Sequence, residues 1–168
     1  MGLADKILEN EEYRRLLREI EDAECDRIFC KHDLSHCLDV ARVATLMCID
    51  RGWDIPKDLI YAASLLHDIG RAGEYRDGSP HDEAGVSIAR SILSSCRADE
   101  DDIRDILKAI SEHRGTDTAY HGDTAKTGRA ALAGLIKEAD KLSRPCMLCR
   151  ARDVCKWPED KKNKIMAL

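Results

Sequence analysis

Hydrophobic residues recur every three or four positions along most of the chain, which is the spacing of one face of an α-helix. Helical patterns cover residues 1–25, 33–50, 57–68, 81–96, 100–113 and 128–142, and the two main interruptions are loops over residues 70–80 and 114–128. No stretch alternates strictly between apolar and polar residues, as a half-buried β-strand does. We therefore expect an all-α protein, a single-domain bundle of about six or seven helices.

Length and charge restrict the partners of such a bundle. The 168 residues suit one domain, and the net charge of −5 argues against a nucleic-acid duplex as the main partner. No apolar run approaches the roughly 18 to 20 residues of a membrane helix. The first residues are charged throughout and lack the apolar core of a signal peptide. We expect a cytoplasmic protein that does not bind a membrane.

Histidines and aspartates stand at the ends of several predicted helices. His67 and Asp68 end one helix before a loop with three glycines, and His81 begins the next helix. His113 ends a further helix where the second loop begins. Because helix ends that border neighbouring loops can converge on one cleft, we expect these side chains to meet there.

Two more ionisable residues belong to the same pattern. Asp140 lies in the apolar helix "LIKEADKLS", where an unpaired carboxylate would be costly. His36 shares a helix face with His32, four positions earlier. Imidazoles and carboxylates that converge on a cleft are the usual ligands for Mn, Fe or Zn. The sequence therefore predicts a metal site.

The order of these residues resembles the HD superfamily of metal-dependent phosphohydrolases, and in particular its small single-domain members such as the YqeK type. The matching segments are "HDLSHCLDVARVA", "AASLLHDIGR", "PHDEAGVSIARSIL", "AISEHRG" and "EADKLS". The resemblance implies an HD domain over residues 26–144. We expect residues 1–25 to form an N-terminal helix before it and residues 145–168 a cysteine-rich tail packed on the same domain.

The resemblance also implies a pair of divalent transition-metal ions, such as Fe or Mn. The first ion would be held by four residues, namely His36, His67, Asp68 and Asp140. Asp68 would bridge to a second ion, which His81 and His113 would complete. We expect His32 to support the site and His121 to be an ordinary loop residue.

The chemistry implied by the resemblance is hydrolysis of a phosphate ester or anhydride through a metal-activated water. A bound metal lowers the pKa of water to about 7. The expected substrate is a nucleotide or another small phosphorylated metabolite. The resemblance and the nearby cations nominate Asp68, Lys141 and Arg71 as catalytic residues, and Arg71, Arg114 and Lys141 as contacts to phosphate oxygens. A homodimer is left open.

Two other functions remain open on the same residues. A di-iron oxygenase of the HD type uses the same kinds of ligand, so the residues alone do not separate it from a hydrolase. A non-catalytic module that binds metal or senses redox state would keep the scaffold and use the cysteines. Tyr75 and Tyr120 lie in the two predicted loops, where a tyrosine can stack on a base.

The tail carries three cysteines in the spacing C-x2-C-x5-C, namely Cys146, Cys149 and Cys155. Flanking arginines and lysines lower the pKa of such thiols. Zinc or an iron–sulfur cluster needs a fourth ligand, and Cys30 is the main candidate, with Cys25 and Cys37 as alternatives. Three reduced thiols or a disulfide are equally open. Burial in apolar helices accounts for Cys48 and Cys96.

Overall fold

The computed structural model describes residues 1–112 and 128–165, apart from the side chain of Asp82. This part of the chain contains α-helices and 3₁₀ turns and no β-strand, which confirms the all-α prediction. The α-helices are α1 (Leu3–Glu9), α2 (Glu11–Ala23), α3 (Leu34–Asp50), α4 (Lys57–Leu66), α5 (Arg71–Asp77), α6 (His81–Ser95), α7 (Glu100–Glu112) and α8 (Leu132–Leu142). The 3₁₀ turns are η1 (Gly128–Ala131), η2 (Cys146–Leu148), η3 (Arg152–Val154) and η4 (Glu159–Lys161).

The N-terminal segment forms two helices instead of the single helix expected over residues 1–25. The chain turns at Asn10, which ends α1 and begins α2. The Asn10 side chain accepts a hydrogen bond from the backbone nitrogen of Tyr13 at 2.9 Å. Asparagine favours this capping position because its side-chain oxygen satisfies a backbone donor that the new helix leaves free. The apolar spacing on both sides of Asn10 concealed the break.

The segment over residues 70–80 is also not the loop that its glycines suggested, because it contains α5. Gly70 is the last residue of the turn between α4 and α5, and it lies against the backbone of α6. A Cβ atom added at Gly70 would lie 1.8 Å from the carbonyl oxygen of His81 and 2.5 Å from the backbone nitrogen of Gly85. Gly78, with φ of 77°, then ends α5 in a left-handed conformation. Gly70 therefore permits close contact between two backbone segments, and Gly78 permits the backbone conformation that ends α5.

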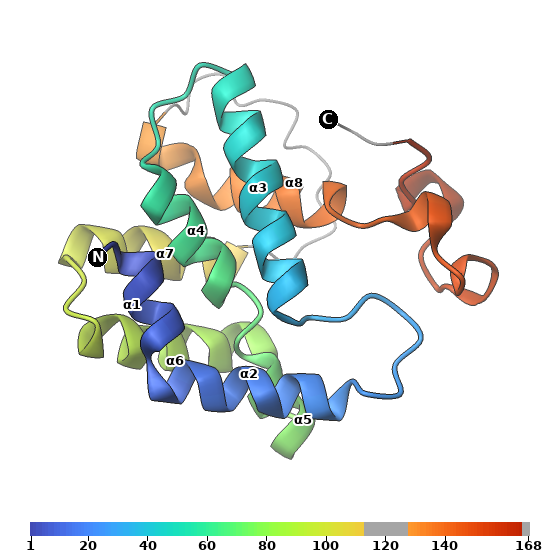
Figure 1. Cartoon of the computed structure of the whole chain (residues 1–168), viewed down its shortest axis with the longest axis horizontal. Helices are drawn as coiled ribbons and strands as arrows, with labels where there is room; N and C mark the ends of the chain where they lie inside the picture. The colour runs from blue at the N-terminus through green and yellow to red at the C-terminus, as the bar shows by residue number, and fades with distance from the viewer. Residues whose placement is uncertain (113–127, 166–168) are drawn as a thin grey trace.

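The helices pack around a core in which α3 contacts α4 and α8, while α7 contacts α6 and α8 (Figure 1). The last apolar residues of α4, Leu65 and Leu66, are almost completely buried in this core. No helix in the described ranges has both the length and the apolar character needed to cross a membrane. The core thus fixes the end of α4, where His67 and Asp68 follow.

Two irregular segments lie together on one side of the helices: the α2–α3 loop (residues 24–33) and the tail (residues 143–165). In Figure 1 both extend to the right of α3, the loop in blue and the tail in orange and red. They border the same cleft. The described part of the tail contains 3₁₀ turns as its regular structure.

Candidate metal centre

Three helical regions bring ligating side chains to one point. His36 on α3, His67 directly after α4 and Asp140 on α8 each offer one ligand atom, and these atoms lie within 4.8 Å of one another. The Nε2 atom of His36 is 3.4 Å from Oδ1 of Asp140. The imidazole rings of His36 and His67 have centroids 5.2 Å apart. Residues far apart in the sequence thus meet at the spacing that a metal ion requires.

Asp68 lies beside this group and is largely buried. Its Oδ2 atom is 3.0 Å from Nε2 of His67 and 3.7 Å from Nε2 of His36. Its Oδ1 atom accepts a hydrogen bond from Nε of Arg71 at 2.9 Å. The two oxygens therefore face different partners, and Arg71 fixes the orientation of the carboxylate toward the histidines.

Hydrogen bonds also set the orientation of two imidazole rings. Nδ1 of His67 lies 2.7 Å from the carbonyl oxygen of Ser64, and Nδ1 of His81 lies 2.8 Å from Oε2 of Glu74. Because a carbonyl or a carboxylate oxygen accepts, each Nδ1 carries a proton, which leaves the Nε2 atom to bind a metal when the ring is neutral. Partners of this kind orient histidine ligands in metal sites.

The charges at the centre favour a cation. Burial alone would lower the pKa of His36, but the carboxylates of Asp140 and Asp68 raise it from 6.5 to about 9. Burial alone would raise the pKa of Asp140, but His36 holds it below its usual value. Nε2 of His36 is buried and makes no hydrogen bond to any described residue. A metal ion would satisfy this nitrogen and both carboxylates, so the donor set fits Mn, Fe or Zn.

His32 adjoins the centre through a buried carboxylate that the sequence did not single out. Glu24 accepts hydrogen bonds from the backbone nitrogen of His32 at 2.7 Å and from its Nδ1 at 2.6 Å. The Nε2 atom of His32 then lies 4.0 Å from Oδ2 of Asp68. The hydroxyl of Tyr75 also donates to Glu24. Glu24 looked like one more charge of an exposed helix, and nothing in its spacing marked it.

The expectation for Tyr75 is wrong. This residue lies on α5 and not in a loop, and its hydroxyl is engaged by Glu24. It is not among the residues that border the cleft. Its hydroxyl therefore points to the end of α2, where Glu24 lies.

The mutation Glu24→Gln should flatten the loss of stability in acid. Burial alone would raise the pKa of Glu24, but hydrogen bonds from His32 and Tyr75 lower it from 4.5 to about 2. A carboxylate with a lowered pKa in the folded state stabilises the protein above its unfolded pKa, and that contribution disappears as the pH falls through the folded value. Urea unfolding at steps from neutral pH to pH 2 should show about 3 kcal/mol less acid-induced loss in the variant.

The matched control for this experiment is Glu21→Gln, because Glu21 is an exposed residue of α2, three positions before Glu24. It should leave the acid dependence of the unfolding free energy unchanged. Equal slopes for wild type and Glu24→Gln would contradict the role assigned to the buried carboxylate.

Three further residues predicted from the sequence line the cleft beside the centre. His81 is buried and, with Arg71 and Lys141, borders the same cleft as His36 and Asp68. Partial burial and the charge of Lys137 lower the pKa of Lys141. Four predicted residues lie outside the described part of the chain, namely His113, Arg114, Tyr120 and His121.

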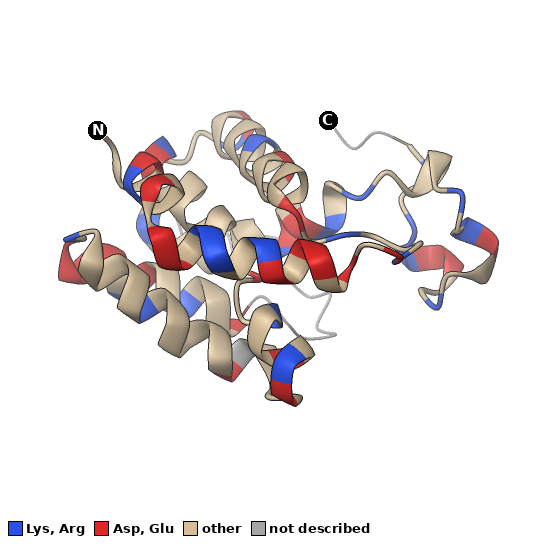
Figure 2. Cartoon of the chain, turned by 60° about the horizontal axis from the view of Figure 1, so that its bottom comes forward, with Lys and Arg blue, Asp and Glu red and all other residues tan. Residues whose placement is uncertain are grey.

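The cleft has a volume of about 900 Å³ and runs from the metal centre to the tail. Its acidic residues gather near the centre, whereas its basic residues come from the α2–α3 loop, α5, α8 and the tail. Figure 2 shows Lys and Arg along both the loop and the tail. The basic residues are Arg27, Lys31, Arg71, Lys141, Arg144, Arg152, Lys156 and Lys162. The cleft is therefore rich in positive charge although the whole chain is acidic.

Comparison with known families gives the same picture as this geometry. The family model for the HD domain matches residues 33–144, which span the chain from just before His36 to just after Asp140. The chain belongs to the HD domain family. HD proteins bind divalent metals, and in this HD protein His36, His67 and Asp140 form a group that can hold one.

Several relatives share this domain. A protein of Clostridium beijerinckii described as uncharacterized is 38% identical over 157 residues, covering 94% of this chain and 93% of that protein. Ribonuclease Y of Acetivibrio thermocellus is 34% identical over 110 residues, covering 66% of this chain and 17% of that enzyme. The HD protein thus spans only a small part of ribonuclease Y.

One solved structure has the same architecture. It is the crystal structure of a predicted HD superfamily hydrolase from an uncultured Thermotogales bacterium. The two proteins are 25% identical, with a TM-score of 0.59, and the similarity covers 89% of this chain and 80% of the other. The helical bundle of the HD type is therefore confirmed.

Proposed function

We propose that this HD protein is a metal-dependent phosphohydrolase that acts on a nucleotide or another small phosphorylated metabolite. The observation that carries the proposal is the convergence of His36, His67 and Asp140 within 4.8 Å, beside Asp68 and inside a basic cleft. A divalent ion bound there supplies Lewis-acid chemistry and a hydroxide at neutral pH. Similarity to the Thermotogales protein, which is described as a predicted HD superfamily hydrolase, supports a hydrolytic reaction.

The size and charge of the cleft support a substrate of the nucleotide class. A volume of about 900 Å³ lies within the range of small-molecule sites, which is about 300 to 1,000 Å³. Basic side chains concentrated in a cleft attract anions and strengthen hydrogen bonds to phosphate oxygens.

The residues around the centre would divide the work. Lys141 borders the cleft next to Asp140, which supports a contact of its ammonium group with a phosphate oxygen. Arg71 donates to Asp68 at 2.9 Å and its Nη1 atom is 3.5 Å from Oε2 of Glu74. We therefore assign Arg71 first to the orientation of Asp68, with phosphate contact as its second role.

The experiment is metal analysis of protein purified without oxygen, combined with detection of both inorganic phosphate and nucleotide products from a panel of substrates. The panel holds nucleoside mono-, di- and triphosphates, dinucleoside polyphosphates, sugar phosphates and a short RNA, because ribonuclease Y is a relative. Bound Fe or Mn and phosphate release from one of the small substrates are expected. Cleavage of RNA alone would overturn the substrate class. Oxygen uptake without any hydrolysis would overturn the reaction in favour of an HD oxygenase.

A further inference from the structure

We propose that Cys30, Cys146, Cys149 and Cys155 form a second metal site, a tetrahedral tetrathiolate site for Zn²⁺ that ties the tail to the α2–α3 loop. This site is separate from the His36, His67 and Asp140 centre in its chemistry, because thiolates select soft metals whereas imidazole and carboxylate select harder ones. The proposal does not depend on the hydrolytic function.

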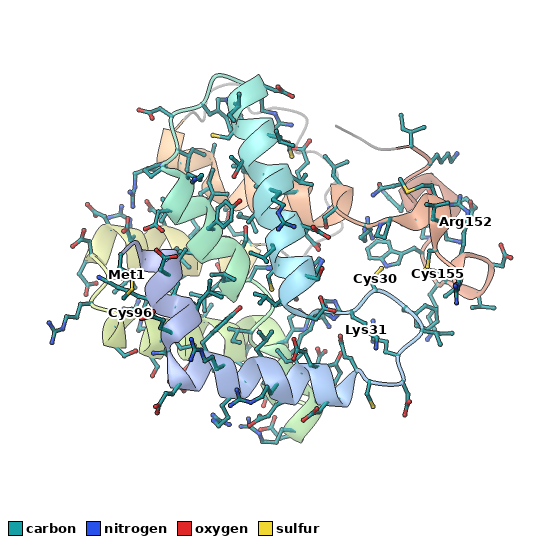
Figure 3. The ribbon with its side chains drawn as sticks, viewed as in Figure 1. Met1, Cys30, Lys31, Cys96, Arg152 and Cys155 are labelled. Carbon is teal, nitrogen blue, oxygen red and sulfur yellow. The ribbon has the colours of Figure 1, made fainter. Side chains whose placement is uncertain are left out.

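The four thiols come from two segments that are distant in the sequence and lie on the same side of the fold. All four cysteines border the same cleft. Burial raises the pKa of the Cys30 thiol, and the three tail thiols raise it further, which requires them to be near. Figure 3 shows Cys30 on the loop beside Cys155 on the tail. The cysteines are free, with no disulfide among the described residues.

Tight turns present the tail cysteines at short spacing. The turn η2 begins at Cys146, and the backbone nitrogen of Cys149 donates to the carbonyl oxygen of Cys146 at 3.4 Å. A second turn follows, in which the backbone nitrogen of Cys155 donates to the carbonyl oxygen of Arg152 at 3.3 Å. Structural zinc sites use turns with two residues between a pair of cysteines. The local backbone thus supports a closed site.

The tail lacks the apolar core that would hold it in place. Leu148 is 86% exposed, Val154 is 65% exposed and Trp157 is 48% exposed. Inside the tail, the well-buried side chains of the described residues are those of Ala151 and Lys162. Small segments that cannot build a core are stabilised by disulfides or metals. Because the cysteines form no disulfide among the described residues, a bound metal is the way in which they could stabilise the tail.

Positive charge around the cysteines suits a tetrathiolate. Four thiolates and one Zn²⁺ carry a net negative charge, and each thiol releases its proton on binding. Arg144 and Arg152 border the same cleft as the four cysteines. The guanidinium of Arg144 also stacks on Trp157 at 4.5 Å, and Arg152 donates to the carbonyl oxygen of Cys146 at 3.1 Å. These contacts hold two cations at the site.

The structure selects Cys30 over the other candidates for the fourth ligand. Cys25 is exposed, and Cys37 is buried with its sulfur 4.0 Å from the carbonyl oxygen of Leu65. Neither borders the cleft. Among the described residues, the ligand atoms within 4.8 Å of one another are those of His36, His67 and Asp140, so the cysteine side chains must rotate inward when they bind zinc.

Cobalt titration of the full chain tests the site, since Co²⁺ bound by thiolates absorbs strongly through thiolate-to-metal charge transfer. The protein is reduced, stripped of metal and titrated without oxygen. We expect charge-transfer absorption that saturates at one equivalent and is abolished by Zn²⁺. The His and Asp centre lacks thiolates and does not give this band. Cobalt binding without the band in the wild-type protein would overturn the proposal.

Two variants test whether the tail cysteines cause the charge-transfer band. Cys149→Ser should lose most of the band's intensity. The matched control Cys25→Ser should keep it, because Cys25 lies in the same α2–α3 loop as Cys30 but is exposed. Circular dichroism checks that both variants are folded. A band that persists in folded Cys149→Ser, or acid-labile sulfide in the protein as purified, would overturn the zinc site, the latter in favour of an iron–sulfur cluster.

Discussion

Replacement of Asp68 by alanine should abolish metal retention and hydrolysis together. The Asp68 carboxylate is 3.0 Å from Nε2 of His67 and 3.7 Å from Nε2 of His36, and it accepts the Nε hydrogen bond of Arg71. Under the proposed function Asp68 is a metal ligand, so its removal weakens metal binding, and it also leaves the partly buried guanidinium of Arg71 without its 2.9 Å contact. We expect kcat/KM to fall by at least about 10³-fold, since a metal contributes several kcal/mol to the stabilisation of transition-state charge. Metal content and phosphate release measure both effects.

Two further variants separate the ligand role from folding. Asp68→Asn keeps the size of the side chain and its acceptor for Arg71, but it removes the charge, so it should fold and still lose metal. Asp39→Ala is the matched control, because Asp39 borders the same cleft from α3 but is half exposed and pairs with Arg42 at 3.1 Å. Full metal content in Asp68→Asn would place the centre elsewhere.

The mutation Gly70→Ala should cause the largest loss of stability for so small a change. The new Cβ would lie 1.8 Å from the carbonyl oxygen of His81 and 2.5 Å from the backbone nitrogen of Gly85. Both contacts are to backbone atoms of α6, which no side-chain rotation can relieve. Overpacking of this severity costs at least about 3 kcal/mol. In a protein of this size, that predicts a drop in Tm of at least about 6 °C.

The matched control is Gly73→Ala on the same helix, α5. Its added Cβ would lie 3.3 Å from the Cβ atom of Ala84, a contact that a small shift relieves. Alanine also favours a helix by about 1 kcal/mol over glycine, so this variant should change stability by less than about 1 kcal/mol. Equal Tm values for the two variants would show that α6 can move away from residue 70.

The helices that carry the centre were predictable because their apolar spacing is long and regular. The segments over residues 33–50, 81–96 and 100–113 correspond closely to α3, α6 and α7. Asp140 was found because a carboxylate in an apolar helix needs a partner. Such positions conflict with their local environment, and that conflict is visible in a single sequence.

Elements defined by contacts between distant segments were not predictable. The helix α5 was missed because its glycines suggested a loop. Gly70 is glycine because the backbone of α6 leaves no room for a side chain, and not because the chain bends there. Glu24 was missed for a similar reason, since its role depends on His32 and Tyr75. Local pattern cannot report a partner 51 residues away. The pairing of Cys30 with the tail cysteines stays a prediction.

The contact between His36 on α3 and Asp140 on α8 affects how the chain folds during synthesis and how it resists proteolysis. The ribosome delivers the first of these ligands long before the last, so a nascent chain has only part of the centre until α8 has emerged. An ion bound by both residues would link α3 to α8 and so close the long chain segment between them. Its binding free energy would add to the free energy of folding. Metal starvation would consequently appear as faster proteolysis of the chain together with the loss of turnover.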